Sequence, residues 1–130
     1  MNEFKVYYED TDASGRVYHA NYLKFLERGR SNLFYKTKYT HEILLKKFDI
    51  IFVVKHCSVN FKKPAFFENT LQVISSIKEL SRVKIIFNQK IYRKSDLLIK
   101  AEVLVIPVNS SGKISKLPDE LYIFLEKLKN

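Results

Sequence analysis

The sequence has only one cysteine, Cys57, so no disulfide can form within the chain, and we expect a reducing compartment, the cytoplasm. No apolar run approaches the roughly 18 residues that span a bilayer, so we expect no transmembrane segment. The first residues, Met1 to Lys5, lack the basic start and apolar core of a secretory signal. Glycine and proline are also scarce, with three of each, and no linker or repeat divides the chain. We therefore expect one domain, residues 1–130.

Acidic residues are also few, 14 against 23 lysines and arginines, which gives a formal net charge of +9. Such a surface favours polyanionic partners, but it is equally typical of a well-solvated protein. The lysines are scattered, with short pairs at Lys46-Lys47 and Lys62-Lys63 rather than a basic tail. Tryptophan is absent, most aromatic residues fall on apolar faces, and no nucleic-acid motif is recognised. We therefore expect no nucleic-acid partner.

The order of the periodic segments predicts an α+β fold. A short strand, Phe4 to Glu9, precedes a long helix, Ala20 to Thr37, whose apolar residues lie within an arc of about 100°. Gly29 lies in that arc and predicts close approach of a neighbouring backbone. A further short helix, 42–48, follows. Four strands with period-two patterns come next, at 51–61, 71–80, 83–92 and 97–108, and a C-terminal helix begins at Pro118. Short connections make these strands antiparallel, in one sheet wrapped on the long helix.

The region before and within the long helix carries a specific motif. The stretch from Tyr7 to Tyr22 reads YYEDTDASGRVYHANY and continues to an ERGR motif at Glu27 to Arg30. It resembles the signature of the 4-hydroxybenzoyl-CoA thioesterase family, and within it the YbgC-type acyl-CoA thioesterases. The stretch from Val59 to Ala65 is similar to the strand ending in Pro-Ala in that family. The resemblance implies a hotdog fold, a five-stranded antiparallel sheet around one long central helix, here with a C-terminal helix added. It also implies homodimers, often paired into homotetramers, with active sites at the subunit interface.

The same resemblance implies that Asp12 is the catalytic carboxylate, as nucleophile or as general base towards water. An aspartate in a loop before a helix more often forms an Asx-turn or a cap, and only the whole motif reverses that expectation. His19 falls where the family places its oxyanion-hole N–H, and three roles stay open for its side chain: orienting Asp12, holding substrate, or packing. Tyr8 and Tyr18 are candidates for lining the acyl site, although core packing explains Tyr8 equally well.

The positions of several other residues in the sequence pattern also suggest roles for them. We expect Glu27 to form a structural ion pair with Arg28 or Arg30, and Cys57 to pack in the core between valines. Asn60 and His56 face the other way and could contact the site across a dimer. Cations are candidates for holding the coenzyme A phosphates, namely Lys62, Lys63, Arg82 and Lys84. Arg16 departs from the family pattern, where an apolar residue is common, and is a further candidate for phosphate contact or for narrowing the mouth.

These assignments predict a thioester hydrolase acting on acyl-CoA, or on acyl groups held by acidic acyl carrier protein, which the basic surface would suit. Such a substrate would place the protein in lipid metabolism. Coenzyme A would enter as part of the substrate, and no other cofactor and no metal is expected. The alternative is a non-catalytic hotdog module that senses acyl-CoA. Its expected mark is loss of the carboxylate, and Asp12 is present.

Overall fold

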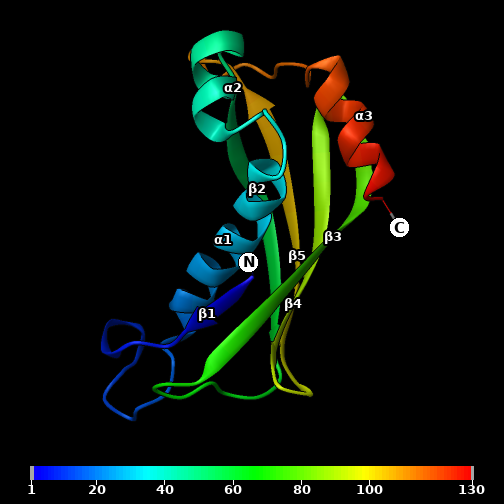
Figure 1. Ribbon diagram of the computed structural model, residues 1–130. Coiled ribbons are helices and arrows are strands. Elements are labelled where there is room, and N and C mark those ends of the chain that lie inside the picture. The colour runs from blue at the N-terminus through cyan, green and yellow to red at the C-terminus, as the bar shows by residue number, and fades with distance from the viewer. Residues whose placement is uncertain (1, 130) are drawn as a thin grey trace.

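The computed structural model describes residues 2–129 and contains a five-stranded antiparallel sheet curved around one long helix (Figure 1). The sheet order is β1-β3-β4-β5-β2. The strands are β1 (Glu3–Lys5), β2 (Ile51–Phe61), β3 (Thr70–Ser81), β4 (Lys84–Arg93) and β5 (Asp96–Val108). This is the architecture that the resemblance implied, with its last four strands within one residue of the predicted ranges.

The long helix α1 (Tyr22–Tyr35) follows a 3-10 turn, η2 (His19–Asn21). Its buried face contains the predicted apolar arc together with Ser31 and Phe34, and it packs against β3 and β4. The core divides into two apolar clusters, one near each end of α1. Between them lies the fully buried Gln89, whose Nε2 donates to the Leu26 carbonyl oxygen and to Ser75 Oγ, both at 2.8 Å.

The same polar layer explains Gly29. A Cβ at this position would lie 2.5 Å from Val73 Cγ1, 3.0 Å from Ser75 Oγ and 3.3 Å from Gln89 Nε2. The glycine therefore admits close packing, as predicted, but what approaches it is three sheet side chains rather than a backbone. The predicted backbone contact is wrong for this reason.

Two shorter helices cover one end of the sheet. Helix α2 (His41–Phe48) begins after Thr40, whose Oγ1 accepts a hydrogen bond from the Ile43 N–H, and ends at Asp49 in the left-handed region (φ 52°). Helix α3 (Asp119–Lys127) lies beside β3 (Figure 1), and its buried residues are Leu121 and Leu125. None of the helices within residues 2–129 is long and apolar enough to cross a membrane.

Two predicted boundaries need correction. The first strand ends at Lys5 rather than at Glu9, because the Tyr7 N–H donates to Asp10 Oδ2 and the Asp10 N–H returns to the Tyr7 carbonyl oxygen, closing a 3-10 turn, η1 (Tyr8–Asp10). Helix α1 begins two residues later than predicted, after η2, and ends at Tyr35. There the Thr37 hydroxyl and N–H both donate to the Phe34 carbonyl oxygen.

Strand β2 forms an edge of the sheet and is exposed along most of its length. Ile51, Val53, Val54 and Phe61 are between 37% and 51% exposed. Cys57 is exposed as well, so its predicted core packing is wrong in the single chain. Its neighbour across the sheet is Val103 of β5, and its other side is open because no further strand follows.

Candidate active site

The loop that carries Asp12 is a tight hairpin. Thr11 and Val17 form an antiparallel bridge, and the Asp12 N–H donates to the Arg16 carbonyl oxygen (2.8 Å). The turn closes through the Gly15 N–H, which donates to the Asp12 carbonyl oxygen (3.0 Å), and Gly15 adopts a positive φ of 80°. This conformation favours glycine and holds Asp12 at the exposed tip of the loop.

Ser14 is the main partner of the Asp12 carboxylate. Its Oδ1 accepts hydrogen bonds from the Ser14 hydroxyl (2.5 Å) and the Ser14 N–H (2.8 Å). These bonds, the hydroxyl first, lower the pKa of Asp12 below its ordinary value. The Arg16 backbone N–H and the Arg16 charge lower this pKa further, by smaller amounts. The loop thus contains an Asx-turn, the alternative structural role of Asp12. The same turn presents an ionised, solvent-exposed carboxylate.

Unpaired backbone donors lie where the helical segment begins. Within residues 2–129, the N–H groups of His19 and Ala20 donate to no other residue. The Tyr18 N–H before them donates to the Asp10 carbonyl oxygen (2.9 Å), and the Asn21 N–H after them donates to the Tyr18 carbonyl oxygen (2.8 Å). The first bond ties the Asp12 loop to the helix start. Free N–H groups at a helix start form a site for developing negative charge.

Contacts with the end of β2 and with the loop that follows it fix the position of this helix start. The buried Tyr22 hydroxyl accepts a hydrogen bond from the Ala65 N–H (2.9 Å), and burial raises the pKa of Tyr22. The His19 ring lies edge-on to Phe61 (centroids 6.3 Å apart) and beside Tyr18 (4.6 Å). Tyr18 and His19 are exposed, so the aromatic group at this end of β2 faces solvent in the single chain.

The remaining predicted residues divide into two groups. Tyr8 is 78% exposed and stacks on Phe67 (4.1 Å), close to the Asp12 loop. Asn60 is exposed near the end of β2, and Lys63 Nζ pairs with Asp96 Oδ1 (3.3 Å) just beyond it. Arg16 lies over the Phe66 ring at 5.9 Å. This group surrounds the end of the structure that holds Asp12.

Arg82 and Lys84 lie elsewhere. Arg82 pairs with Asp119 and stacks over Tyr122 (4.4 Å), beside helix α3. Strand β3, with 12 residues, separates this corner from the Asp12 loop by roughly 35 Å. Within one chain the structure therefore does not bring Arg82 and Lys84 to Asp12.

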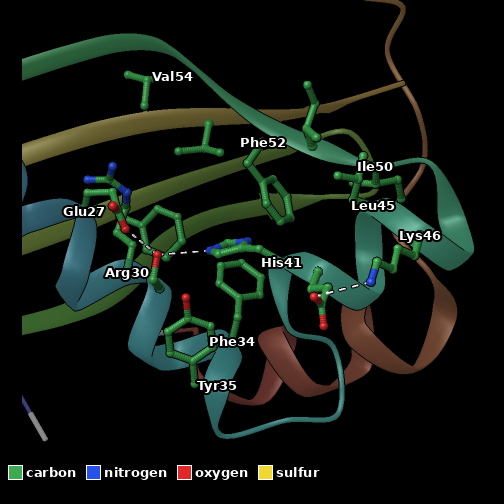
Figure 2. A pocket seen from close by; sticks show the side chains of 15 residues that line it. Glu27, Arg30, Phe34, Tyr35, His41, Leu45, Lys46, Ile50, Phe52 and Val54 are labelled. Carbon is green, nitrogen blue, oxygen red and sulfur yellow. Dashed lines mark hydrogen bonds and ion pairs between the residues drawn. The ribbon is translucent and has the colours of Figure 1, made fainter. Parts of the chain in front are cut away.

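A second feature is a cavity that the sequence did not reveal. It has a volume of about 630 Å³ and lies between the second half of α1, helix α2 and the first half of β2 (Figure 2). This is within the usual range of small-molecule sites. Its lining is mainly apolar and includes Phe34, Leu45, Phe52, Phe87 and Val105. These residues belong to the predicted helices and strands, but only the fold brings them together.

One wall of this cavity is polar. Ser31 Oγ donates to Glu27 Oε2 (2.5 Å) and lies 3.0 Å from His41 Nε2 (Figure 2). Burial lowers the pKa of His41, while the nearby Glu27 opposes that shift. The serine stands between the carboxylate and the imidazole, whereas a nucleophilic triad needs the histidine in the middle. The three side chains thus suit recognition rather than nucleophilic attack.

The predicted ion pair of Glu27 is wrong. Within residues 2–129, no salt bridge within 4 Å joins Glu27 to Arg28 or Arg30. Ser31 takes its place as the partner, Arg30 Nη1 donates to Gln89 Oε1 (3.0 Å), and Arg28 lies over the Phe25 ring. In the described part of the chain, no group of three or more His, Cys, Asp or Glu side chains could hold a metal ion.

Comparison with known proteins decides the family. A model described as the thioesterase-like superfamily matches residues 6–125. The chain belongs to this superfamily. It is 38% identical over 105 residues to the acyl-CoA thioesterase YbgC of Haemophilus influenzae, covering 81% of this chain and 77% of that one. It is 36% identical over 106 residues to the acyl-CoA thioester hydrolase YbgC of Escherichia coli, covering 81% and 78%.

A solved structure agrees with these relatives. The probable thioesterase from Bartonella henselae superimposes with a TM-score of 0.86 at 36% identity, covering 89% of this chain and 96% of that one. The predicted resemblance to YbgC-type thioesterases, the hotdog fold and the thioester hydrolase class are confirmed.

In this thioesterase the Asp12 loop and the cavity lie at opposite ends of β2. The cavity uses the first residues of the strand, Ile51 to Val54, while the aromatic group of His19 packs on its last residue, Phe61. The cavity lining reaches Val54 on β2, roughly 23 Å of extended chain from Phe61, and Glu27 on α1, roughly 10 Å along the helix from Ala20. Within one chain the nearest part of the cavity therefore lies about two helical turns from the free N–H groups.

Proposed function

We propose that this thioesterase hydrolyses acyl-CoA, with Asp12 as the catalytic carboxylate and the free N–H groups at the helix start as the oxyanion site. The observation that carries this proposal is the pairing of an ionised, exposed carboxylate with unpaired N–H donors on one hydrogen-bonded loop. The curated relatives named above are acyl-CoA thioesterases, which supports the substrate class.

The chemistry needs two contributions. The N–H groups of His19 and Ala20 would stabilise the negative charge that develops on the thioester oxygen, an effect worth roughly 3–4 kcal/mol for one donor. Asp12 would then act in one of two ways. As a general base it takes a proton from water, whose oxygen bonds to the carbonyl carbon before the C–S bond breaks and the thiolate leaves. As a nucleophile it forms a mixed anhydride with release of the thiolate, and water hydrolyses the anhydride.

The active site proposed here requires two copies of the chain. An 11-residue edge strand with exposed apolar residues is a ready partner for a second strand, and isolated proteins normally protect such edges. Two-fold antiparallel pairing of β2 with β2 of a second copy places the start of one strand beside the end of the other. The cavity of one subunit then faces the Asp12 loop of its partner. A homotetramer built from two such dimers is compatible with the same arrangement.

The cavity would receive the acyl group in this assembly, and the coenzyme A portion would lie towards the exposed cations near the Asp12 loop. Lys63 and Arg16 lie on that side, whereas Arg82 and Lys84 could contribute only from another subunit. The net charge of +9 also suits acyl groups carried by an acidic carrier protein. An unpaired, exposed cysteine fits a cytoplasmic location.

The direct test is release of free thiol from a series of acyl-CoA esters, comparing the wild-type protein with Asp12→Asn. Asparagine keeps an Oδ1 acceptor for Ser14, so the loop should fold unchanged, but it is neither base nor nucleophile. We expect kcat/KM to fall roughly 10²- to 10⁴-fold. An Asp12→Asn protein that turns over like wild type would refute the assignment, and acyl-CoA binding without turnover by the wild type would support the non-catalytic module instead.

A further inference from the structure

The hydrogen bonds of the polar wall determine which of its atoms carry protons. The Glu27 carboxylate only accepts hydrogen bonds when ionised, and Ser31 has a single hydroxyl proton, which its 2.5 Å contact with Glu27 Oε2 uses. Ser31 Oγ must then accept the hydrogen bond from His41, so Nε2 of His41 carries the proton (3.0 Å). In the neutral ring, Nδ1 is consequently an acceptor.

His41 lines the cavity, and no residue of the described range 2–129 donates a hydrogen bond to its Nδ1. The His41 ring is held among aromatic rings, with centroids of Phe34 at 5.3 Å, Tyr35 at 5.9 Å and Phe52 at 5.9 Å (Figure 2). An apolar ligand that displaces water from this wall would leave Nδ1 unsatisfied.

The charges beside His41 restrict the ligand further. Four charged side chains line the cavity, Glu27 and Glu42 against Arg30 and Lys46, so its lining is neutral as a whole. Arg30 is also engaged by Gln89, a fully buried residue. An ionised ligand carboxylate has no proton to donate to Nδ1. An uncharged hydroxyl group has such a proton, and burying it costs less than burying an ammonium.

We infer that the cavity selects acyl groups with an uncharged hydroxyl away from the thioester, and that His41, held by Ser31, is the residue that determines this specificity. The inference rests on the acyl-CoA hydrolysis proposed above, since it assigns the cavity to the acyl group. Glu27 acts as a positioning residue, because it fixes the Ser31 proton and thereby the tautomer of His41.

The test uses matched substrates that differ by one hydroxyl group. The wild-type protein is assayed by thiol release with hexanoyl-CoA and with its 3-, 5- and 6-hydroxy derivatives. We expect at least one derivative to exceed hexanoyl-CoA in kcat/KM by about 5- to 100-fold, chiefly through a lower KM. Adipoyl-CoA, which ends in a carboxylate, should be poorer than the best hydroxy derivative.

Variants of His41 test whether this residue causes the preference for hydroxylated substrates. His41→Phe keeps a ring of similar shape but removes both nitrogens, so the ratio of hydroxylated to plain substrate should fall to about one. His41→Gln restores a polar group and should recover part of the ratio. Tyr39→Phe is the matched control, because it deletes a hydroxyl that bonds Glu120 outside the cavity (3.0 Å), and it should keep the wild-type ratio.

The outcomes are distinguishable. Hydrolysis of hexanoyl-CoA with no preference for any hydroxy derivative, or a preference that survives His41→Phe, overturns the inference and leaves the proposed function intact. Absence of hydrolysis of every ester tested removes the proposed function itself.

Discussion

At the residue scale the main partner of Asp12 is Ser14, which gives its carboxylate two hydrogen bonds. These bonds stabilise the ionised form and lower the pKa of Asp12. The sequence motif predicted the carboxylate, but not that the serine two residues later holds it. An Asx-turn is usually regarded as the alternative to catalysis, yet here the turn occupies Oδ1 only, so the two interpretations are compatible.

Removal of the Ser14 hydroxyl gives a pH-dependent prediction. Because Asp12 must be ionised to act, activity is lost as pH falls through its pKa, which in the wild type lies below the ordinary aspartate value. Ser14→Ala removes the largest cause of that lowering, so the acidic limb of the kcat/KM profile should move to higher pH. The profile is measured with a substrate cleaved well at neutral pH. An acidic limb that does not move would show that Asp12 is not the group that titrates.

Gly29 gives a prediction about stability at the same scale. A methyl group there would lie 2.5 Å from Val73 Cγ1, in a fully packed region. Gly29→Ala gains roughly 1 kcal/mol of helix propensity but should lose about 1–3 kcal/mol through overpacking, which lowers the melting temperature overall. The measurement is thermal unfolding of Gly29→Ala, Val73→Ala and the double variant. The two changes should be non-additive, with the double variant more stable than their sum, and simple additivity would contradict the contact.

The elements themselves were largely predictable from sequence periodicity. The long helix, the C-terminal helix and the last four strands matched their predicted ranges within about two residues, because each has a regular apolar pattern, which all of them except β2 bury in the single chain. The first strand was predicted too long, since Tyr8 continues the alternation while the Asp10 side chain caps a turn. Periodicity detects apolar faces and does not detect such local polar contacts.

Strand β2 shows another limit of the same kind. Its alternating pattern predicted a strand, but not that this strand lies at the sheet edge, and Cys57 was therefore misplaced in the core. Strand order depends on which edges pair, and a hydrophobic pattern along one strand carries little of that information. Pairing of β2 with β2 of a second copy would cover its exposed apolar side chains.

The dimer predicted here has a matched pair of tests at the element scale. Val54 on β2 is 48% exposed, and Ile123 on α3 is 51% exposed. Val54→Asp places a charge on the proposed interface and should convert the protein to monomers with strongly reduced thioesterase activity, whereas Ile123→Asp should change neither. Light scattering coupled to size-exclusion chromatography reports the mass. A wild-type monomer, or a Val54→Asp dimer with full activity, would contradict pairing through β2.

The whole molecule separates the two parts that hydrolysis requires. The motif at Asp12 could be predicted from the sequence because its residues are contiguous. The cavity could not, because it is assembled from α1, α2, β2, β4 and β5. Nor does any sequence pattern show that the two parts use different stretches of β2, Ile51 to Val54 for the cavity and Phe61 for the aromatic contact with His19. The exposed apolar edge of β2 is the strongest reason to assign each active site to two copies.

Complementation between two inactive variants tests this shared site most directly. The partner of Asp12→Asn is Leu45→Trp, in which a half-exposed leucine of α2 is enlarged to block the cavity. Each variant is checked for folding by circular dichroism and assayed for thiol release alone. The two are then unfolded, mixed in equal amounts and refolded together.

A mixed dimer contains one site with an intact Asp12 from one copy and an open cavity from the other. We therefore expect the mixture to recover about a quarter of wild-type activity, since half of the dimers are mixed and each has one working site. Activity no greater than the mean of the two separate variants would contradict it, and would place the carboxylate and the acyl cavity within the same chain.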